Sequence, residues 1–175
     1  MVVVLAVAAT VCVQATTILP ADLGDLVRDA YSIAQGQVIA LDSRWTSDHR
    51  AIETTVTFRV DAYLKGDLGA TLQFRVPGGR IGRFDSVMVG APRFAVSQNA
   101  VVFLGARGPS VPYVLGLGQG VFRLVPTAGG WLVTPPALLP SASGTVGVVR
   151  GDVSRRPVPL ADFSRQVRSL AAGAR

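Results

Sequence analysis

The sequence has very few of the residues that commonly carry chemistry: one cysteine (Cys12), one histidine (His49) and one lysine (Lys65). Zinc and other transition-metal sites need several histidine or cysteine ligands, which this chain does not offer. A catalytic dyad or triad needs a base beside its nucleophile, and His49 lies between Asp48 and Arg50 in a stretch typical of a solvated turn. Lys65 lies in a turn between two predicted strands, a poor place to desolvate an amine. We therefore expect no catalytic residues, no metal site and no cofactor.

The carboxylates also lack an arrangement that suggests chemistry. The acidic residues are ten aspartates and one glutamate. A calcium site needs clustered oxygen ligands, whereas Asp42 and Asp48 flank one predicted turn and Asp61 and Asp67 flank another. No two carboxylates have a recognisable acid–base setting. A calcium site, and an enzyme that uses only Asp, Ser, Tyr and Arg, are left open but are not favoured.

The net charge is positive, but the composition gives it an ordinary explanation. The formal net charge is +6, and sixteen of the seventeen basic residues are arginines. With abundant Ala, Gly, Val and Pro, this preference indicates a GC-rich bacterial genome, which raises the pI without any anionic partner. Nucleic-acid surfaces more often show Lys/Arg clusters with interleaved aromatic residues. The 49% of apolar residues is enough for one core domain.

The first fifteen residues predict the compartment. Residues 1–13 carry no charge and are almost wholly apolar, and Val13-Gln14-Ala15 offers small residues where signal peptidase reads them. This pattern predicts a signal peptide over residues 1–15 with cleavage after Ala15, although the basic n-region is missing. The stretch is short for a membrane span. We expect a secreted or periplasmic protein whose mature chain has no cysteine and hence no disulfide.

The clearest structural signal lies between residues 50 and 79. From Ile52 to Leu64, apolar residues at even positions alternate with mostly polar residues at odd positions, which predicts a strand with one buried face. Residues 65–69 have turn chemistry, and residues 70–76 resume the alternation before the break at Pro77-Gly78-Gly79. Residues 33–45 predict a preceding strand, apolar on both faces around residues 38–41 and therefore central or bulged. A polar turn over residues 46–50 joins the two strands as a hairpin.

The rest of the chain predicts shorter elements. We expect a helix over residues 20–31, an irregular segment over 80–99, a fully buried strand over 100–104, a strand over 113–125 punctuated by three glycines, and a return strand over 131–134. Residues 135–159 are rich in Pro, Ser and Gly and predict a mobile linker. Residues 160–172 predict an amphipathic helix that docks on the barrel, with contact to a partner or to an anionic membrane surface as the alternative.

These elements predict a mainly β fold: a small five- to six-stranded OB-like barrel with a short N-terminal helix and an amphipathic C-terminal helix. The predicted division of the chain is a signal peptide (1–15), the barrel domain (16–134), the linker (135–159) and the C-terminal helix (160–175). No internal repeat is visible.

The turn and packing elements Leu64-Lys65-Gly66, Pro77-Gly78-Gly79 and Gly118-Gln119-Gly120, the last followed by Phe122, resemble those of uncharacterised bacterial secreted proteins. That group is distantly similar to the tissue-inhibitor-of-metalloproteinase and netrin-like modules. The resemblance covers about residues 22–134 and the C-terminal helix, and it implies an OB-like fold. The inhibitors chelate the protease zinc through an N-terminal cysteine. Since the mature chain here would lack one, that mechanism is not carried over.

Two glycine-rich stretches have ordinary structural interpretations. Residues 116–120 resemble part of a dinucleotide-binding loop, but the following residues continue as a strand where a helix would be needed. Residues 78–83 could cradle an anion, although a β-turn that carries solvated arginines is the better interpretation.

We predict that a binding surface lies on the outward faces of the two alternating strands and in the loop beyond them. OB barrels bind ligands on this face, and exposed arginine and tyrosine often anchor interfaces. The candidate residues are Arg59, Tyr63, Arg75, Arg80, Arg83 and Phe84. We expect a secreted, non-enzymatic module that binds a protein partner. The alternative is an OB-fold protein that binds an oligonucleotide or oligosaccharide through a basic strand face.

Overall fold

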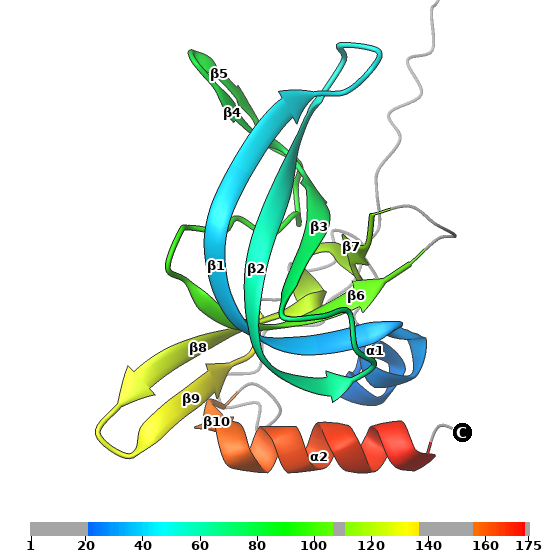
Figure 1. Ribbon diagram of the computed structural model, residues 1–175, viewed down its shortest axis with the longest axis vertical. Helices are drawn as coiled ribbons and strands as arrows, with labels where there is room; N and C mark the ends of the chain where they lie inside the picture. The colour runs from blue at the N-terminus through cyan, green and yellow to red at the C-terminus, as the bar shows by residue number, and fades with distance from the viewer. Residues whose placement is uncertain (1–20, 107–110, 137–155, 174–175) are drawn as a thin grey trace, which may run out of the picture.

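The computed structural model describes residues 21–106, 111–136 and 156–173. The predicted signal peptide and most of the predicted linker lie outside these residues. The described chain is mainly β, with two helices and a sheet that closes on itself (Figure 1). No helix in this part of the chain is long and apolar enough to cross a membrane.

A closed barrel of five strands forms the centre of the fold. Its strands are β1 (Ser32–Trp45), β2 (Ile52–Lys65), β3 (Thr71–Pro77), β6 (Asn99–Gly105) and β7 (Tyr113–Val114). They pair in the order β1-β2-β3-β7-β6, and β6 pairs again with β1 to close the ring. All of these pairings are antiparallel except that of β3 with β7. This confirms the predicted OB-like barrel.

Further elements extend or cover the barrel. They are α1 (Leu23–Asp29), β4 (Gly79–Ile81), β5 (Phe84–Ser86), the 3-10 helix η1 (Leu117–Gly120), β8 (Val121–Thr127), β9 (Gly130–Thr134), β10 (Val158–Pro159) and α2 (Leu160–Gly173). Strands β8, β9 and β10 continue the sheet from β6, whereas β4 and β5 form a separate hairpin. Figure 1 shows this hairpin projecting at one end of the barrel and both helices lying at the other end.

The alternation in β2 correctly predicted its two faces. Val56 and Phe58 are fully buried, whereas Arg59 and Asp61 are exposed. The predicted bulge in β1 is present as well, because its register against β2 shifts between Val38 and Ala40. Alternation in β3 begins only at Leu72, since Ala70 is exposed.

The buried strand β6 separates two apolar clusters. Ala100, Val102 and Leu104 face the inside of the barrel, where they pack with residues of β1, β2 and β3. Val101 and Phe103 face the helices. The apolar stripe of α2 closes this second cluster, with Phe163 and Val167 buried. The helix therefore docks on the barrel with its apolar side inward, as predicted.

Several predicted boundaries were wrong. The first helix spans only Leu23–Asp29. The strand predicted over residues 113–125 is divided into β7, η1 and β8, because Gly116 and Leu117 adopt left-handed φ values of 57° and 56° that a strand cannot accommodate. The end of the predicted linker is ordered, since β10 pairs with β9.

Candidate functional site

The six predicted site residues fall into two groups. Arg59, Tyr63 and Arg75 lie on β2 and β3, whereas Arg80, Arg83 and Phe84 belong to the β4–β5 hairpin. The hairpin begins just beyond the end of β3, where Glu53 of β2 pairs with Pro77. Since Arg59 is six residues away from Glu53 along β2, Arg59 lies roughly 20 Å from the start of the hairpin. Arg75 lies only two residues before Pro77 and is therefore much closer to the hairpin.

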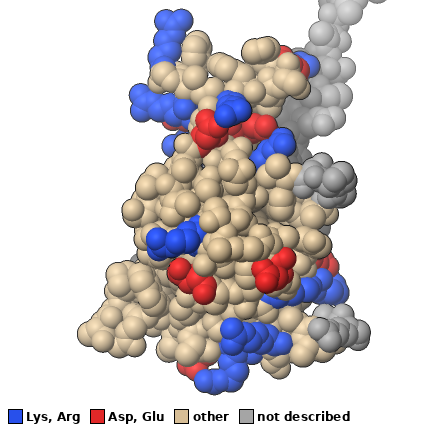
Figure 2. Space-filling view, viewed as in Figure 1, with Lys and Arg blue, Asp and Glu red and all other residues tan. Residues whose placement is uncertain are grey.

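The arginines of the strand group already have partners within the chain. Arg59 donates a hydrogen bond to the side-chain oxygen of Gln37 (3.0 Å) and lies 3.9 Å from a carboxylate oxygen of Asp61. Arg75 is paired with Glu53 at 3.2 Å. On the face shown in Figure 2, basic and acidic side chains occur together in small groups and do not form a continuous basic patch. The outer strand face is therefore largely neutralised.

Tyr63 is tied into its own turn. Its hydroxyl donates a hydrogen bond to the carbonyl oxygen of Gly69 at 2.8 Å. Partial burial, and to a smaller extent the charge of Asp67, raise the pKa of Tyr63 above its ordinary value. The phenol therefore stays neutral at physiological pH and stabilises the turn.

The hairpin group exposes more apolar surface than the strand group does. Phe84 is 49% exposed and makes an edge-on contact with Trp45, with ring centroids 5.6 Å apart. The guanidinium carbon of Arg83 lies 5.2 Å from the centre of the Phe84 ring, and Arg80 donates a hydrogen bond to the carbonyl oxygen of Gly82. Arginine and aromatic side chains are thus combined at the end of the molecule.

Three consecutive apolar residues extend this surface beyond the hairpin. Val87, Met88 and Val89 are 66%, 49% and 75% exposed. Together with Phe84 we call them the tip patch. The sequence predicted only an irregular segment over residues 80–99 and did not identify these three residues as exposed. The feature of the sequence that could have indicated this surface is the apolar run Val87-Met88-Val89 in a segment without strand periodicity.

A groove of about 500 Å³ lies between the segment that holds Val87, Met88 and Val89 and the residues Ser43 of β1 and Thr54 of β2, all of which line it. Ser43 and Thr54 lie in its wall and are joined through their hydroxyl oxygens at 2.9 Å. Gly79, the first residue of β4, lies against these two hydroxyl groups and has a φ of 145°. A Cβ atom at this position would lie 2.7 Å from the Ser43 hydroxyl oxygen and would overlap the Thr54 hydroxyl oxygen. Glycine at this position lets the hairpin approach the barrel closely.

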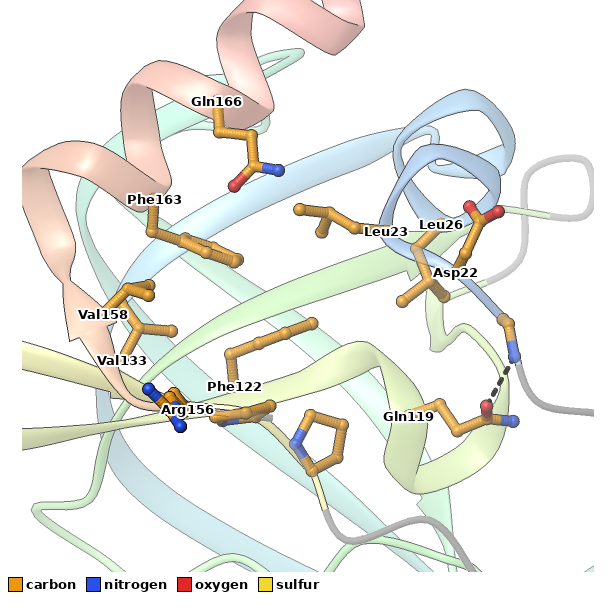
Figure 3. A pocket seen from close by; sticks show the side chains of 13 residues that line it. Asp22, Leu23, Leu26, Gln119, Phe122, Val133, Arg156, Val158, Phe163 and Gln166 are labelled. Carbon is orange, nitrogen blue, oxygen red and sulfur yellow. Dashed lines mark hydrogen bonds between the residues drawn. The ribbon is translucent and has the colours of Figure 1, made fainter. Parts of the chain in front are cut away.

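A second pocket, of about 420 Å³, lies between the two helices, η1 and β9 (Figure 3). Phe122 and Phe163 form its aromatic wall, and Gln119 contributes polar atoms. The Gln119 side-chain oxygen accepts a hydrogen bond from the backbone N–H of Ala21 at 2.8 Å. Its walls are mainly apolar, and its lining includes Ala21, Pro136 and Arg156, each at an end of a described range. The sequence had not pointed to Gln119 as a residue of a pocket.

Asp48 and His49, the titratable residues in the turn between β1 and β2, belong to the structure of that turn. A hydrogen bond from the Thr46 hydroxyl, followed by one from the Arg50 backbone N–H, lowers the pKa of Asp48 below its ordinary value of 3.8. His49 is exposed with a positive φ of 53°. Across the described ranges, no three His, Cys, Asp or Glu side chains are grouped so that they could hold a metal ion.

Comparison with known proteins gives no relative for this chain. No family model, no curated protein and no solved structure matches it. The resemblance to the tissue-inhibitor-of-metalloproteinase and netrin-like modules therefore stays a prediction.

Proposed function

We propose that this chain is a secreted, non-enzymatic β-barrel module that binds a protein partner through the tip patch. The single observation behind this proposal is the exposure of four apolar side chains: Phe84 in the β4–β5 hairpin, and Val87, Met88 and Val89 in the segment that follows it. Patches of exposed apolar surface mark interaction sites. Aromatic residues, methionine and arginine are enriched in protein interfaces, and Arg80 and Arg83 border this surface.

The attachment of the tip to the barrel supports this role. The backbone N–H of Gly78 donates to the carbonyl oxygen of Ile52 (2.8 Å), and the Thr54 hydroxyl donates to the carbonyl oxygen of Gly78 (2.7 Å). The ring contact between Trp45 and Phe84 adds a side-chain anchor. A surface that is held in place before binding loses less conformational entropy when the partner docks.

The oligonucleotide or oligosaccharide alternative has less support. It requires free basic groups on the strand face, whereas Arg59 and Arg75 are paired with Asp61 and Glu53. Nucleic-acid affinity depends on phosphate contacts and weakens steeply with salt. The alternative predicts measurable binding of single-stranded DNA at low salt, and absence of that binding rules out the oligonucleotide form.

Site-specific photo-crosslinking tests the proposed surface. A photoreactive amino acid at Met88 is expected to capture a partner from the extracellular or periplasmic fraction of the source organism. The same probe at Thr57, on the outer face of β2, is expected to capture nothing. The captured protein should bind the unlabelled chain and lose that binding when Val87 and Met88 are both changed to serine. Val125→Ser changes an equally apolar residue that is 46% exposed on β8 and should leave binding intact. Equal crosslinking at both positions would refute the proposed site.

A further inference from the structure

The second half of β1 has a strand edge that is open. From Ala40 to Trp45, β1 pairs on one side with β2. On its other side it pairs with β6 only as far as Gln37, and Val38 then exchanges hydrogen bonds with Ser97 and Gln98. Within the described ranges, no strand pairs with this second edge beyond Val38. Figure 1 shows β1 at the outside of the barrel along this half.

The backbone groups that face this open edge can be assigned. The Thr46 N–H donates to the carbonyl oxygen of Ala51 at 2.9 Å, so Thr46 directs its backbone groups toward the β2 side of the hairpin. Successive residues of a strand direct their N–H and C=O groups to opposite edges. Trp45, Ser43 and Leu41 therefore direct theirs to the open edge. An unpaired edge of this kind is a template for another strand.

The side chains divide between the two faces of β1. Leu41, Ser43 and Trp45 pair with Val56, Thr54 and Ile52, all buried, and therefore lie on the inner face. Leu41 and Trp45 are nevertheless 37% and 38% exposed, because β1 continues past β6 here. Asp42 and Arg44 lie opposite Thr55 and Glu53 in the register and are on the outer face, where they form an ion pair with each other at 2.7 Å.

We propose that the open edge binds the same edge of a second copy of this chain, antiparallel and centred on Ser43. In this register Asp42 lies opposite Arg44 of the second copy, and Leu41 lies opposite Trp45 of the second copy. Each of these pairs occurs twice because of the two-fold symmetry. Opposite charges and apolar side chains are the cross-strand pairs that stabilise an antiparallel sheet. The outer face of the new ribbon is charge-complementary, and on its inner face two Leu41–Trp45 pairs flank the central Ser43 residues.

The neighbouring registers are disfavoured by the same residues. Two residues directly opposite each other in an antiparallel pair either both direct their backbone groups to the shared edge or both direct them away from it. The register can therefore shift only in steps of two residues. The nearest alternative registers are centred on Asp42 and on Arg44. The first places Asp42 opposite Asp42, and the second places Arg44 opposite Arg44. Like charges directly opposite each other destabilise a pair. The sequence of the open edge thus selects the register centred on Ser43.

Charge substitutions test this dimer. We expect the purified chain to sediment as a dimer with increasing concentration. Asp42→Arg and Arg44→Asp should each weaken dimerisation by roughly tenfold or more, because each turns both opposite-charge pairs into like-charge pairs. The two variants should associate with each other when mixed, since every pair in the mixed dimer has opposite charges. The double variant D42R/R44D should dimerise like the original chain.

The matched control lies on the neighbouring strand. Arg59 and Asp61 form an ion pair with the same two-residue spacing on the outer face of β2, away from the open edge. Arg59→Asp and Asp61→Arg should leave dimerisation unchanged. A chain that stays monomeric at all concentrations overturns the proposal. So does a mixture of the two β1 variants that fails to associate although circular dichroism shows both to be folded.

The dimer and the tip patch can be tested separately. The serine substitutions at Val87 and Met88 should abolish partner binding but keep the dimer, whereas Asp42→Arg should remove the dimer and leave the tip intact. A dimer would present two tips on one assembly, which raises the apparent affinity for a multivalent partner.

Discussion

The ammonium group of Lys65, at the end of β2, donates hydrogen bonds to the carbonyl oxygens of Val27 (2.8 Å) and Arg28 (3.1 Å) in α1. The last carbonyls of a helix have no partner within the helix, so Lys65 satisfies two of them from the barrel. Helix α1 has seven residues and is too short to be stable alone. The only lysine of the chain thus has a structural role that its predicted position in an exposed turn did not suggest.

Replacing Lys65 by methionine should lower the free energy of unfolding by about 1–2 kcal/mol, because two hydrogen bonds to a charged donor are lost while the apolar stem is kept. Urea denaturation followed by circular dichroism measures this change. Arg165→Met removes a cation from an exposed ion pair with Asp162 and should leave stability nearly unchanged. Equal stability of the two variants would show that Lys65 does not fasten the helix.

Gly36 and Gly129 should respond in opposite ways to alanine. A Cβ atom at Gly36 would overlap the carbonyl oxygen of Arg59 and lie 2.9 Å from the Phe58 ring, where β1 pairs with both β2 and β6. Gly36→Ala should therefore cost about 3 kcal/mol or prevent folding. Gly129 has open space around its Cβ position among the described residues, and its φ is not positive.

Gly129→Ala should consequently leave the free energy of unfolding unchanged or raise it by about 0.4–1 kcal/mol, because alanine restricts the unfolded chain. Thermal unfolding of the two variants beside the original chain measures both effects. A Gly36→Ala protein that melts at the original temperature would contradict the close approach of β1 and β2 at this crossing.

The sequence predicted the barrel well where local periodicity and burial agree. Val56 and Phe58 repeat every second residue in β2, and both are buried. The same periodicity misled the prediction between Leu115 and Val121, where glycines alternate with two leucines and Gln119. There the left-handed backbone of Gly116 and Leu117 turns the chain into η1. Backbone conformation of this kind depends on tertiary packing and leaves little trace in the pattern of apolar residues.

The candidate site was predicted only in part for a related reason. Arg80, Arg83 and Phe84 were recognised by residue type; Phe84 belongs to the tip patch, and the two arginines border it. Val87, Met88 and Val89 were missed, because an apolar run has the same appearance in a sequence whether other elements cover it or not. The open edge of β1 was missed similarly. Residues 38–41 are apolar on both faces and predicted a strand that is central or bulged. The bulge is present, but β1 is central only as far as Gln37, where its pairing with β6 ends.

Phe163 and Phe84 test the distinction between a packing aromatic and a surface aromatic. Phe163 is 4% exposed, and its ring centroid lies 4.9 Å from that of Phe122 and 6.5 Å from that of Phe103. Phe163→Ala should lower the free energy of unfolding by about 3–4 kcal/mol, because it leaves a cavity beneath α2.

Phe84→Ala should change that free energy by about 1 kcal/mol or less, since the ring is half exposed and its aromatic contact is with Trp45. Urea unfolding of both variants gives the comparison, and binding to the partner captured through Met88 gives a second readout. Phe84→Ala should weaken that binding in a protein that is still fully folded. If Phe163→Ala is no less stable than Phe84→Ala, α2 does not contribute to the core. If Phe84→Ala binds the partner like the original chain, the ring of Phe84 lies outside the contact.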